Sequence, residues 1–242
     1  MSESIQDELR ALVSEFRNSL ALHHENGRHE WPVESFVKEE IEVSEAVQSG
    51  RLELMPPVDK EAMILDLVRQ DLGDCKRCAL HQNRQHIVFG SGNENADLLF
   101  IGDAPGADED SQGVPFVGEA GQLLDKMIVA MGFKRQDVYV ANVLKCHTPE
   151  GRVPKEDEIS ECKRFLEEQI QTIKPKVIVT LGLSAAQVLL QTKAPLDVLR
   201  GNWNKFLSSD VMPTFHPSSL LKDPRMKKDT WSDLQAVMAK LA

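Results

Sequence analysis

The chain has 242 residues, enough to bury one complete α/β core, and its 41% hydrophobic and 27% charged residues are typical of a globular protein. Its apolar runs are shorter than the roughly 18 to 20 residues that cross a bilayer, which argues against an integral membrane protein and against a membrane as partner. The net charge of −10 gives no support to nucleic-acid binding, but residues 1–72 alone hold 7 Lys and Arg against 16 Asp and Glu. The remaining residues are close to neutral and could bind DNA where their cations cluster.

Residues 1–60 are predicted to form an acidic N-terminal extension that begins with a helix. Apolar residues from Ile5 to Leu20 recur at helical spacing, and residues 23–57 read as a polar, charged linker. Solubility and recruitment of a protein partner both remain open as its role. The first ten residues lack the basic and apolar pattern of a secretion signal, so we expect a cytoplasmic protein, and we expect it to be a monomer.

Strands and helices alternate in residues 61–242, which are expected to form the functional domain. Apolar strands are predicted at 96–103, 137–144, 176–182 and 211–216, and helices at 121–132, 154–173, 183–191 and 227–241. This alternation predicts a three-layer α/β/α fold with a central four-stranded parallel sheet. Functional residues of such sheets lie at the carboxyl ends of the strands. Here those ends carry GDAPG (102–106), NVLKCHTP (142–149), GLSAAQ (182–187) and FHPSS (215–219).

The chain contains four cysteines, Cys75, Cys78, Cys146 and Cys162. A C-x2-C pair in a cytosolic protein is most often a metal or redox pair, and the other two cysteines could complete a four-thiolate site. Zinc and a [4Fe–4S] cluster both use four cysteines, and the spacing does not choose between them. Unrelated buried thiols beside a redox pair are the remaining alternative.

Five motifs, taken together, resemble the family-4 uracil-DNA glycosylases, which carry a [4Fe–4S] cluster. They are DCKRCAL (74–80), GDAPGADEDSQGVPFVGEAGQLL (102–124), VYVANVLKCHTP (138–149), Cys162 and FHPSSLL (215–221). The resemblance runs from about residue 72 to the end. It implies a uracil-DNA glycosylase-like fold and a [4Fe–4S] cluster held by the four cysteines.

The resemblance also implies roles in binding a flipped-out base. Phe116 would be the surface on which uracil stacks, and Asn142 would read its edge, because an amide offers a donor and an acceptor together. His216 would stabilise negative charge on the departing uracil. Gly102 and Ala104 would lie against the substrate. Without the motifs, Phe116 could be a core residue and Asn142 a turn residue.

The nucleophile is less clearly indicated. The family motif usually reads Gly-Glu-x-Pro-Gly, and here Asp103 stands at the Glu position. The next position, where the best-known uracil glycosylases place a water-activating Asp, is Ala104. Asp103 and Glu109 are therefore the candidates for orienting water and stabilising an oxocarbenium-like sugar. His147 and Gly151 are further departures, since family members often have Arg and Asn there.

Leu220 is a candidate wedge for the space that the flipped base leaves in DNA, with Leu221 as its rival, and either could instead be a core residue. A basic cluster follows and would either contact phosphates or form an exposed helix start: Lys222, Arg225, Lys227 and Lys228.

The predicted function is that of a DNA-repair glycosylase: a monofunctional hydrolase that removes uracil from DNA and leaves an abasic site. A superfamily member that prefers another deaminated base is one alternative. A non-enzymatic iron–sulfur protein that binds nucleic acid or transfers electrons is another, but it leaves GDAPG, Asn142 and the HPS motif unexplained.

Overall fold

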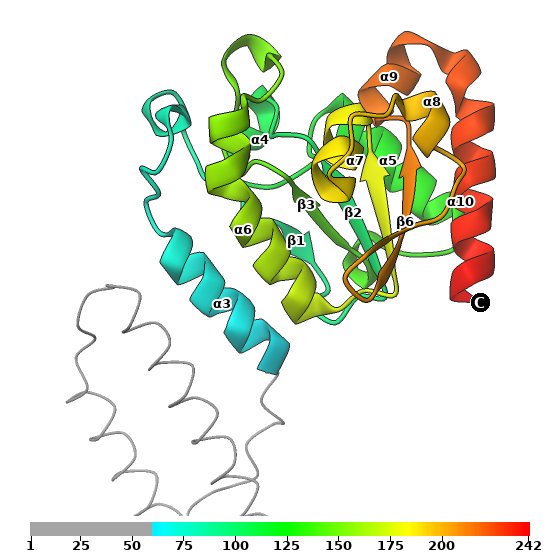
Figure 1. Cartoon of the computed structure of the whole chain (residues 1–242), viewed down its shortest axis with the longest axis horizontal. Helices are drawn as coiled ribbons and strands as arrows, with labels where there is room; N and C mark the ends of the chain where they lie inside the picture. Colours follow the sequence, from blue (N-terminus) through cyan, green and yellow to red (C-terminus); the bar gives the residue numbers. More distant parts are fainter. Residues whose placement is uncertain (1–59) are drawn as a thin grey trace, which may run out of the picture. The chain divides into compact units, whose positions relative to one another are not determined.

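The computed structural model describes residues 60–242, which contain a six-stranded sheet with the strand order β1-β3-β2-β4-β6-β5 (Figure 1). The four inner strands run parallel, and each edge strand is antiparallel to its neighbour. The strands are β1 (Ser91–Gly92), β2 (Leu98–Gly102), β3 (Tyr139–Asn142), β4 (Val177–Leu181), β5 (Asn204–Phe206) and β6 (Ser209–Thr214). The helix expected at 5–20 and the linker after it lie outside the described residues, so the domain boundary near residue 60 stays a prediction.

The four predicted parallel strands are confirmed as β2, β3, β4 and β6. The prediction of a four-stranded sheet was incomplete, because β1 and β5 extend it on either side. These edge strands contain two and three residues. Such short strands are too brief to display the alternating pattern by which a strand is recognised in a sequence.

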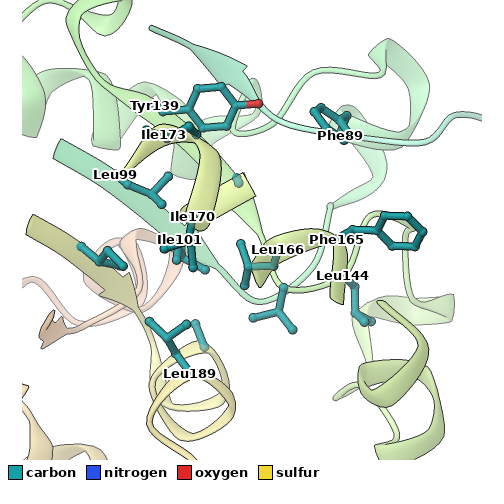
Figure 2. Packing of buried hydrophobic residues seen from close by; sticks show 14 of the residues in the cluster. Phe89, Leu99, Ile101, Tyr139, Leu144, Phe165, Leu166, Ile170, Ile173 and Leu189 are labelled. Carbon is teal, nitrogen blue, oxygen red and sulfur yellow. The ribbon is translucent and has the colours of Figure 1, made fainter. Parts of the chain in front are cut away.

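Strand residues alternate between two hydrophobic clusters, one on each face of the sheet. In β2, Leu99 and Ile101 join the first cluster, and Leu98 and Phe100 join the second. Figure 2 shows Leu99 and Ile101 of the first cluster beside side chains of the helix that covers this face. Because all five residues of β2 are buried, the strand reads as a continuous apolar run in the sequence.

Helices cover both faces and complete the three predicted layers (Figure 1). The first cluster includes side chains of α3 (Lys60–Leu72), α6 (Glu156–Ile173) and α7 (Leu183–Leu190). The second includes side chains of α5 (Glu119–Ala130), α9 (Pro217–Lys222) and α10 (Lys227–Leu241). Short α4 (Ala107–Gln112) and α8 (Leu196–Leu199) lie in connections, with single 3-10 turns η1 (Ala79–Gln82), η2 (Arg135–Asp137), η3 (Pro149–Gly151) and η4 (Pro224–Met226). None of the helices in residues 60–242 has the length and apolar character needed to cross a membrane.

The four predicted helices are present as α5, α6, α7 and α10. The observed start of α6 lies two residues after Pro154, because Glu158 accepts a hydrogen bond from the backbone N–H of Lys155 at 2.8 Å and so caps the helix there. At its other end Lys174 adopts a left-handed conformation and Pro175 follows, which ends the helix.

Candidate active site

The carboxyl ends of the four parallel strands meet at one edge of the sheet. Gly102 at the end of β2 is paired in register with Asn142 at the end of β3. The connection continues beyond the strands, because the N–H of Leu144 donates to the carbonyl of Asp103 at 3.0 Å. Gly182, which follows β4, donates its N–H to Thr214 of β6 at 2.9 Å. Backbone pairing therefore joins the motifs GDAPG and NVLKCHTP, and it places GLSAAQ beside the strand end that leads into FHPSS.

Gly102 lies directly beneath two of the predicted base-binding side chains. A Cβ atom at this position would lie 2.5 Å from Asn142 Oδ1 and 2.6 Å from Phe116 Cζ. Both distances are shorter than a Cβ atom accepts, so any other residue here would displace the Asn142 amide or the Phe116 ring. The same distances show that the Asn142 amide and the Phe116 ring converge above the end of β2.

Phe116 is held in an unusual backbone conformation. Its φ is 55°, in the left-handed region, and its side chain is buried. Its ring centroid lies 5.6 Å from that of His216, with the planes inclined by 35°. A left-handed bulky residue costs on the order of 1–3 kcal/mol unless the surrounding structure imposes it, and such strain is common at functional sites.

Glu109 supplies the contacts that impose this conformation. Its carboxylate accepts hydrogen bonds from the backbone N–H groups of Gly106 (3.0 Å), Val117 (2.9 Å) and Gly118 (3.1 Å). It thus joins the start of α4 to the two residues that follow Phe116. Because the Glu109 carboxylate already accepts three hydrogen bonds from the backbone, it is better suited to holding the loop in shape than to orienting a water molecule.

Asn142 carries an unpaired acceptor inside the protein. The residue is 2% exposed, and its Oδ1 atom has no hydrogen-bond partner among the described residues. A buried polar atom without a partner costs about 1–3 kcal/mol. A ligand with an N–H group at this position would remove that cost, so this atom is a candidate contact for a ligand.

Asp103 and His216 lie on either side of Gly182. A Cβ on Gly182 would be 3.6 Å from Asp103 Oδ2 and 3.2 Å from His216 Cβ. Asp103 Oδ1 accepts a hydrogen bond from the N–H of Ala185, in the first turn of α7, at 2.7 Å. Burial raises the pKa of Asp103 to about 6, and the Ala185 N–H opposes this shift. Its neighbour Ala104 packs against the first hydrophobic cluster.

His216 is fixed as a neutral imidazole. Its Nδ1 accepts a hydrogen bond from the backbone N–H of Ser218 at 3.1 Å and lies 2.7 Å from Ser218 Oγ. Since Nδ1 is an acceptor, the ring proton resides on Nε2. Burial lowers the pKa of His216 to about 4, with Glu109 acting in the opposite sense, so the ring is uncharged at neutral pH.

The two candidate wedge leucines differ sharply in exposure. Leu220 is 1% exposed and belongs to the second hydrophobic cluster, whereas Leu221 is 44% exposed. All four residues of the basic cluster beside them are exposed. Of these, Arg225 pairs with Asp223 at 2.7 Å.

The four cysteines line a single cavity, and none forms a disulfide. Cys75 and Cys78 come from the segment between α3 and η1, Cys146 from the loop after β3 and Cys162 from α6. Within residues 60–242, no group of three or more His, Cys, Asp and Glu side chains is arranged to bind a single metal ion. The cavity that they share therefore shows that the four cysteines lie close together.

Positive and N–H groups point at these sulfurs. Arg84 donates to Cys146 Sγ at 3.3 Å and to the carbonyl of Cys75 at 2.7 Å, and Arg77 donates to Cys75 Sγ at 3.4 Å. Burial raises the pKa of Cys162 to about 11 and also raises that of Cys146, for which Arg84 acts in the opposite sense. The arginines therefore favour the thiolate form that metals bind.

Lys145 lines the cysteine cavity and was not singled out from the sequence. Its side chain is fully buried, and burial lowers its pKa to about 8. A charged residue inside the apolar run VYVANVLKC was the available signal, because a buried lysine needs a specific partner. Ser218, which sets the ring proton of His216, was also missed, although it lies within the HPS motif.

The fold and these side chains define a class of protein. The strand ends of an α/β sheet bring together an aromatic ring, a buried unpaired amide oxygen, a neutral imidazole and a carboxylate. Such a set of groups is typical of an enzyme site that holds a flat, polar ring and stabilises charge.

Comparison with known proteins identifies the family. The Uracil DNA glycosylase superfamily matches residues 89–235, a range that includes Asp103, Phe116, Asn142 and His216. A type-4 uracil-DNA glycosylase of Archaeoglobus fulgidus is 37% identical over 183 residues, covering 72% of this chain and 91% of that protein. One of Thermotoga maritima is 41% identical over 162 residues, covering 66% and 84%, and one of Saccharolobus solfataricus is 37% identical over 187 residues, covering 74% and 87%. The chain belongs to the uracil DNA glycosylase superfamily, and the predicted family resemblance is confirmed.

Proposed function

We propose that this protein removes uracil from DNA by hydrolysing the N-glycosidic bond, leaving an abasic site. The observation that carries the proposal is the unpaired, buried Oδ1 of Asn142 beside the Phe116 ring, in a chain of this superfamily. The flipped uracil stacks on Phe116, and its N3–H donates to Asn142 Oδ1 while its O4 faces the amide N–H. Cytosine has an acceptor at N3 and a donor at position 4, so it does not complement the amide in this orientation.

His216 acts on the leaving group. As the bond between N1 and C1′ breaks, its electron pair stays with uracil and negative charge accumulates on O2. The Nε2–H of the neutral imidazole donates to that oxygen, which stabilises the charge most effectively in a buried pocket. Because His216 has a pKa of about 4, it does so as a hydrogen-bond donor without surrendering a proton.

Asp103 acts on the sugar and the water. Its carboxylate is charged above a pH of about 6, so it stabilises the cationic sugar and accepts a hydrogen bond from the attacking water. The water oxygen bonds to C1′, its proton passes to Asp103 or to solvent, and the uracil anion later takes up a proton. Glu109, by contrast, is a positioning residue for the Phe116 loop.

Leu221 is the better placed wedge. A side chain that fills the gap left by a flipped base must be exposed before DNA binds, and Leu221 meets this condition whereas Leu220 does not. The exposed lysines nearby are suited to phosphate contacts.

The four cysteines hold a [4Fe–4S] cluster. Two observations support this assignment: all four line one cavity, and Arg77 and Arg84 donate hydrogen bonds to the sulfurs of two of them. Bound there, the cluster supplies a rigid cross-link between the segment before η1, the loop after β3 and α6, rather than a reacting group. Zinc would use the same thiolates, but a zinc protein is colourless and an iron–sulfur protein is brown.

The decisive test is cleavage of a labelled oligonucleotide with a single deoxyuridine, followed by alkali. We expect wild-type protein to produce an alkali-sensitive site at the uracil. Asn142→Ala and His216→Ala should each reduce the excision rate on the order of 10²-fold, because the first removes the amide that binds the base edge and the second removes the donor to the uracil O2. Asn202→Ala, in the exposed turn after α8, is the matched control and should retain the wild-type rate. An iron-loaded wild type that leaves uracil in place but cleaves at another deaminated base would overturn the uracil assignment.

A further inference from the structure

Lys145 lies between the base pocket and the cysteine cavity, with its side chain 0% exposed. Its ammonium group donates to the backbone carbonyl of Asn142 at 2.8 Å and to Gln169 Oε1 at 2.6 Å. Both acceptors are neutral oxygens. The ammonium group also lies over the Phe89 ring, 5.9 Å from its centroid. A buried ammonium group is costly unless an opposite charge lies nearby, and none of these three partners carries one.

The opposite charge is available on the cysteine side. The backbone N–H of Lys145 donates to Cys162 Sγ at 3.3 Å, and Lys145 lines the same cavity as the four cysteines. Cys162 and Gln169 are seven residues apart on α6, which places them on one face of the helix. The Gln169 amide is itself fixed, because its Nε2 donates to the carbonyl of Phe89 at 2.9 Å.

We propose that Lys145 is a positioning residue that couples the cysteine site to base reading. Its ammonium group fixes the carbonyl of Asn142, and with it the strand end from which the Asn142 amide projects. Lys145 also lines the cysteine cavity, so it brings a buried positive charge to the site where the thiolates would hold the cluster. This inference rests on the proposed function, since it takes Asn142 as the base reader and the cysteines as cluster ligands.

The test compares Lys145→Met with Lys163→Met in iron-loaded, full-length protein. Methionine keeps most of the lysine volume but neither its charge nor its hydrogen bonds. Lys163 follows Cys162 directly and pairs with Glu167 at the partly exposed surface, so its removal controls for loss of a cation near the cysteines. Three quantities are measured: uracil excision, binding to DNA that contains an abasic site, and the reduction potential of the cluster.

We expect Lys145→Met to reduce kcat/KM for uracil excision by about tenfold or more, because the Asn142 amide is displaced. Binding to abasic DNA should be unchanged, since it needs no base reader. The reduction potential should become more negative, because a buried cation favours the reduced cluster. Lys163→Met should resemble wild type in all three. A merely structural role for Lys145 would not shift the potential.

A Lys145→Met protein with wild-type excision, or with a wild-type potential, overturns the proposed coupling. If this variant does not fold, Gln169→Leu serves in its place, since it removes one acceptor and keeps the charge. It should lower excision while leaving abasic-site binding intact, and unaltered excision would overturn the proposal. Failure of the proposed function would instead appear in the wild-type protein, as absent iron or absent uracil release.

Discussion

At the residue scale, burial sets the protonation states of Asp103 and His216, the two side chains that we propose act in the reaction. A buried site disfavours charge, so it raises the pKa of a carboxyl group and lowers that of an imidazole. Asp103 shifts up to about 6 and His216 down to about 4. Above pH 6 the carboxylate is charged and the imidazole is neutral, which are the forms that the proposed reaction needs.

We therefore predict that the rate of uracil excision falls about tenfold per pH unit below pH 6 and is constant from pH 7 to 8.5. The rate falls because protonated Asp103 neither accepts a hydrogen bond from water nor stabilises a cation. Single-turnover rates between pH 5 and 9 measure this profile. Asp103→Asn should be slower by on the order of 10²-fold and should lack the inflection, and Asp103→Glu should keep an inflection. An inflection near pH 6 that survives in Asp103→Asn would assign the titration to another group.

The residues of the pocket were largely predictable from the sequence, but two roles were not. Gly102, Asn142 and His216 stand at strand ends, and parallel strands bring such ends together. Glu109 contacts backbone groups eight and nine residues further on, which no local pattern encodes. The choice between Leu220 and Leu221 depends on where α9 begins, and a helix of six residues shows too little periodicity to fix its buried face.

At the scale of elements, the loop that carries Phe116 is held on both sides: Glu109 accepts from Val117 and Gly118, and Arg135 donates to the carbonyl of Pro115 at 2.8 Å. We predict that Glu109→Ala slows uracil excision by about 10- to 100-fold, because Phe116 leaves its left-handed conformation. The same substitution should lower the free energy of unfolding by about 1–3 kcal/mol, because the N–H groups of Val117 and Gly118 lose their partner. Single-turnover kinetics and denaturant unfolding measure the two effects.

Glu119→Ala, an exposed change at the start of α5, is the control and should behave like wild type in both measurements. The pH inflection assigned to Asp103 should remain in Glu109→Ala. Its loss there would mean that Glu109 belongs to the reacting groups after all.

The fold was predictable from the same element-scale features that bury its strands. β2 and β4 are buried at every position, so they appear in the sequence as apolar runs between polar helices. The edge strands, the helix α3 and the short α4, α8 and α9 escaped prediction. α3 buries only Leu65, Val68 and Leu72, and the boundaries of the short elements come from tertiary contacts. One example is the cap of α9, in which His216 accepts from Ser218.

At the scale of the whole domain, the cysteine site and the pocket share the loop after β3. This loop begins at Asn142, passes through Cys146 and reaches α6, whose capping residue Glu158 pairs with Arg152. Val153 within it is 76% exposed, and Glu150 and Gly151 both adopt positive φ. A metal site that forms only in the folded state contributes its binding free energy to stability. Here that contribution acts on the segments that the cysteines join.

Iron removal should therefore loosen residues 142–155 before the rest of the domain. We predict that chelated protein loses its brown colour, unfolds at a lower temperature and is cut by trypsin first after Arg152 or Lys155. The trypsin sites in α10, on the opposite face of the sheet, should be cut at the same rate with and without iron. The reason is that α10 packs in the second hydrophobic cluster, which contains no side chain of the cysteine-bearing segments. Mass spectrometry of timed digests identifies the cuts. Equal cleavage of residues 142–155 in the two forms would show that the loop is held by Arg152 and Glu158 and by its packing rather than by the cysteine site.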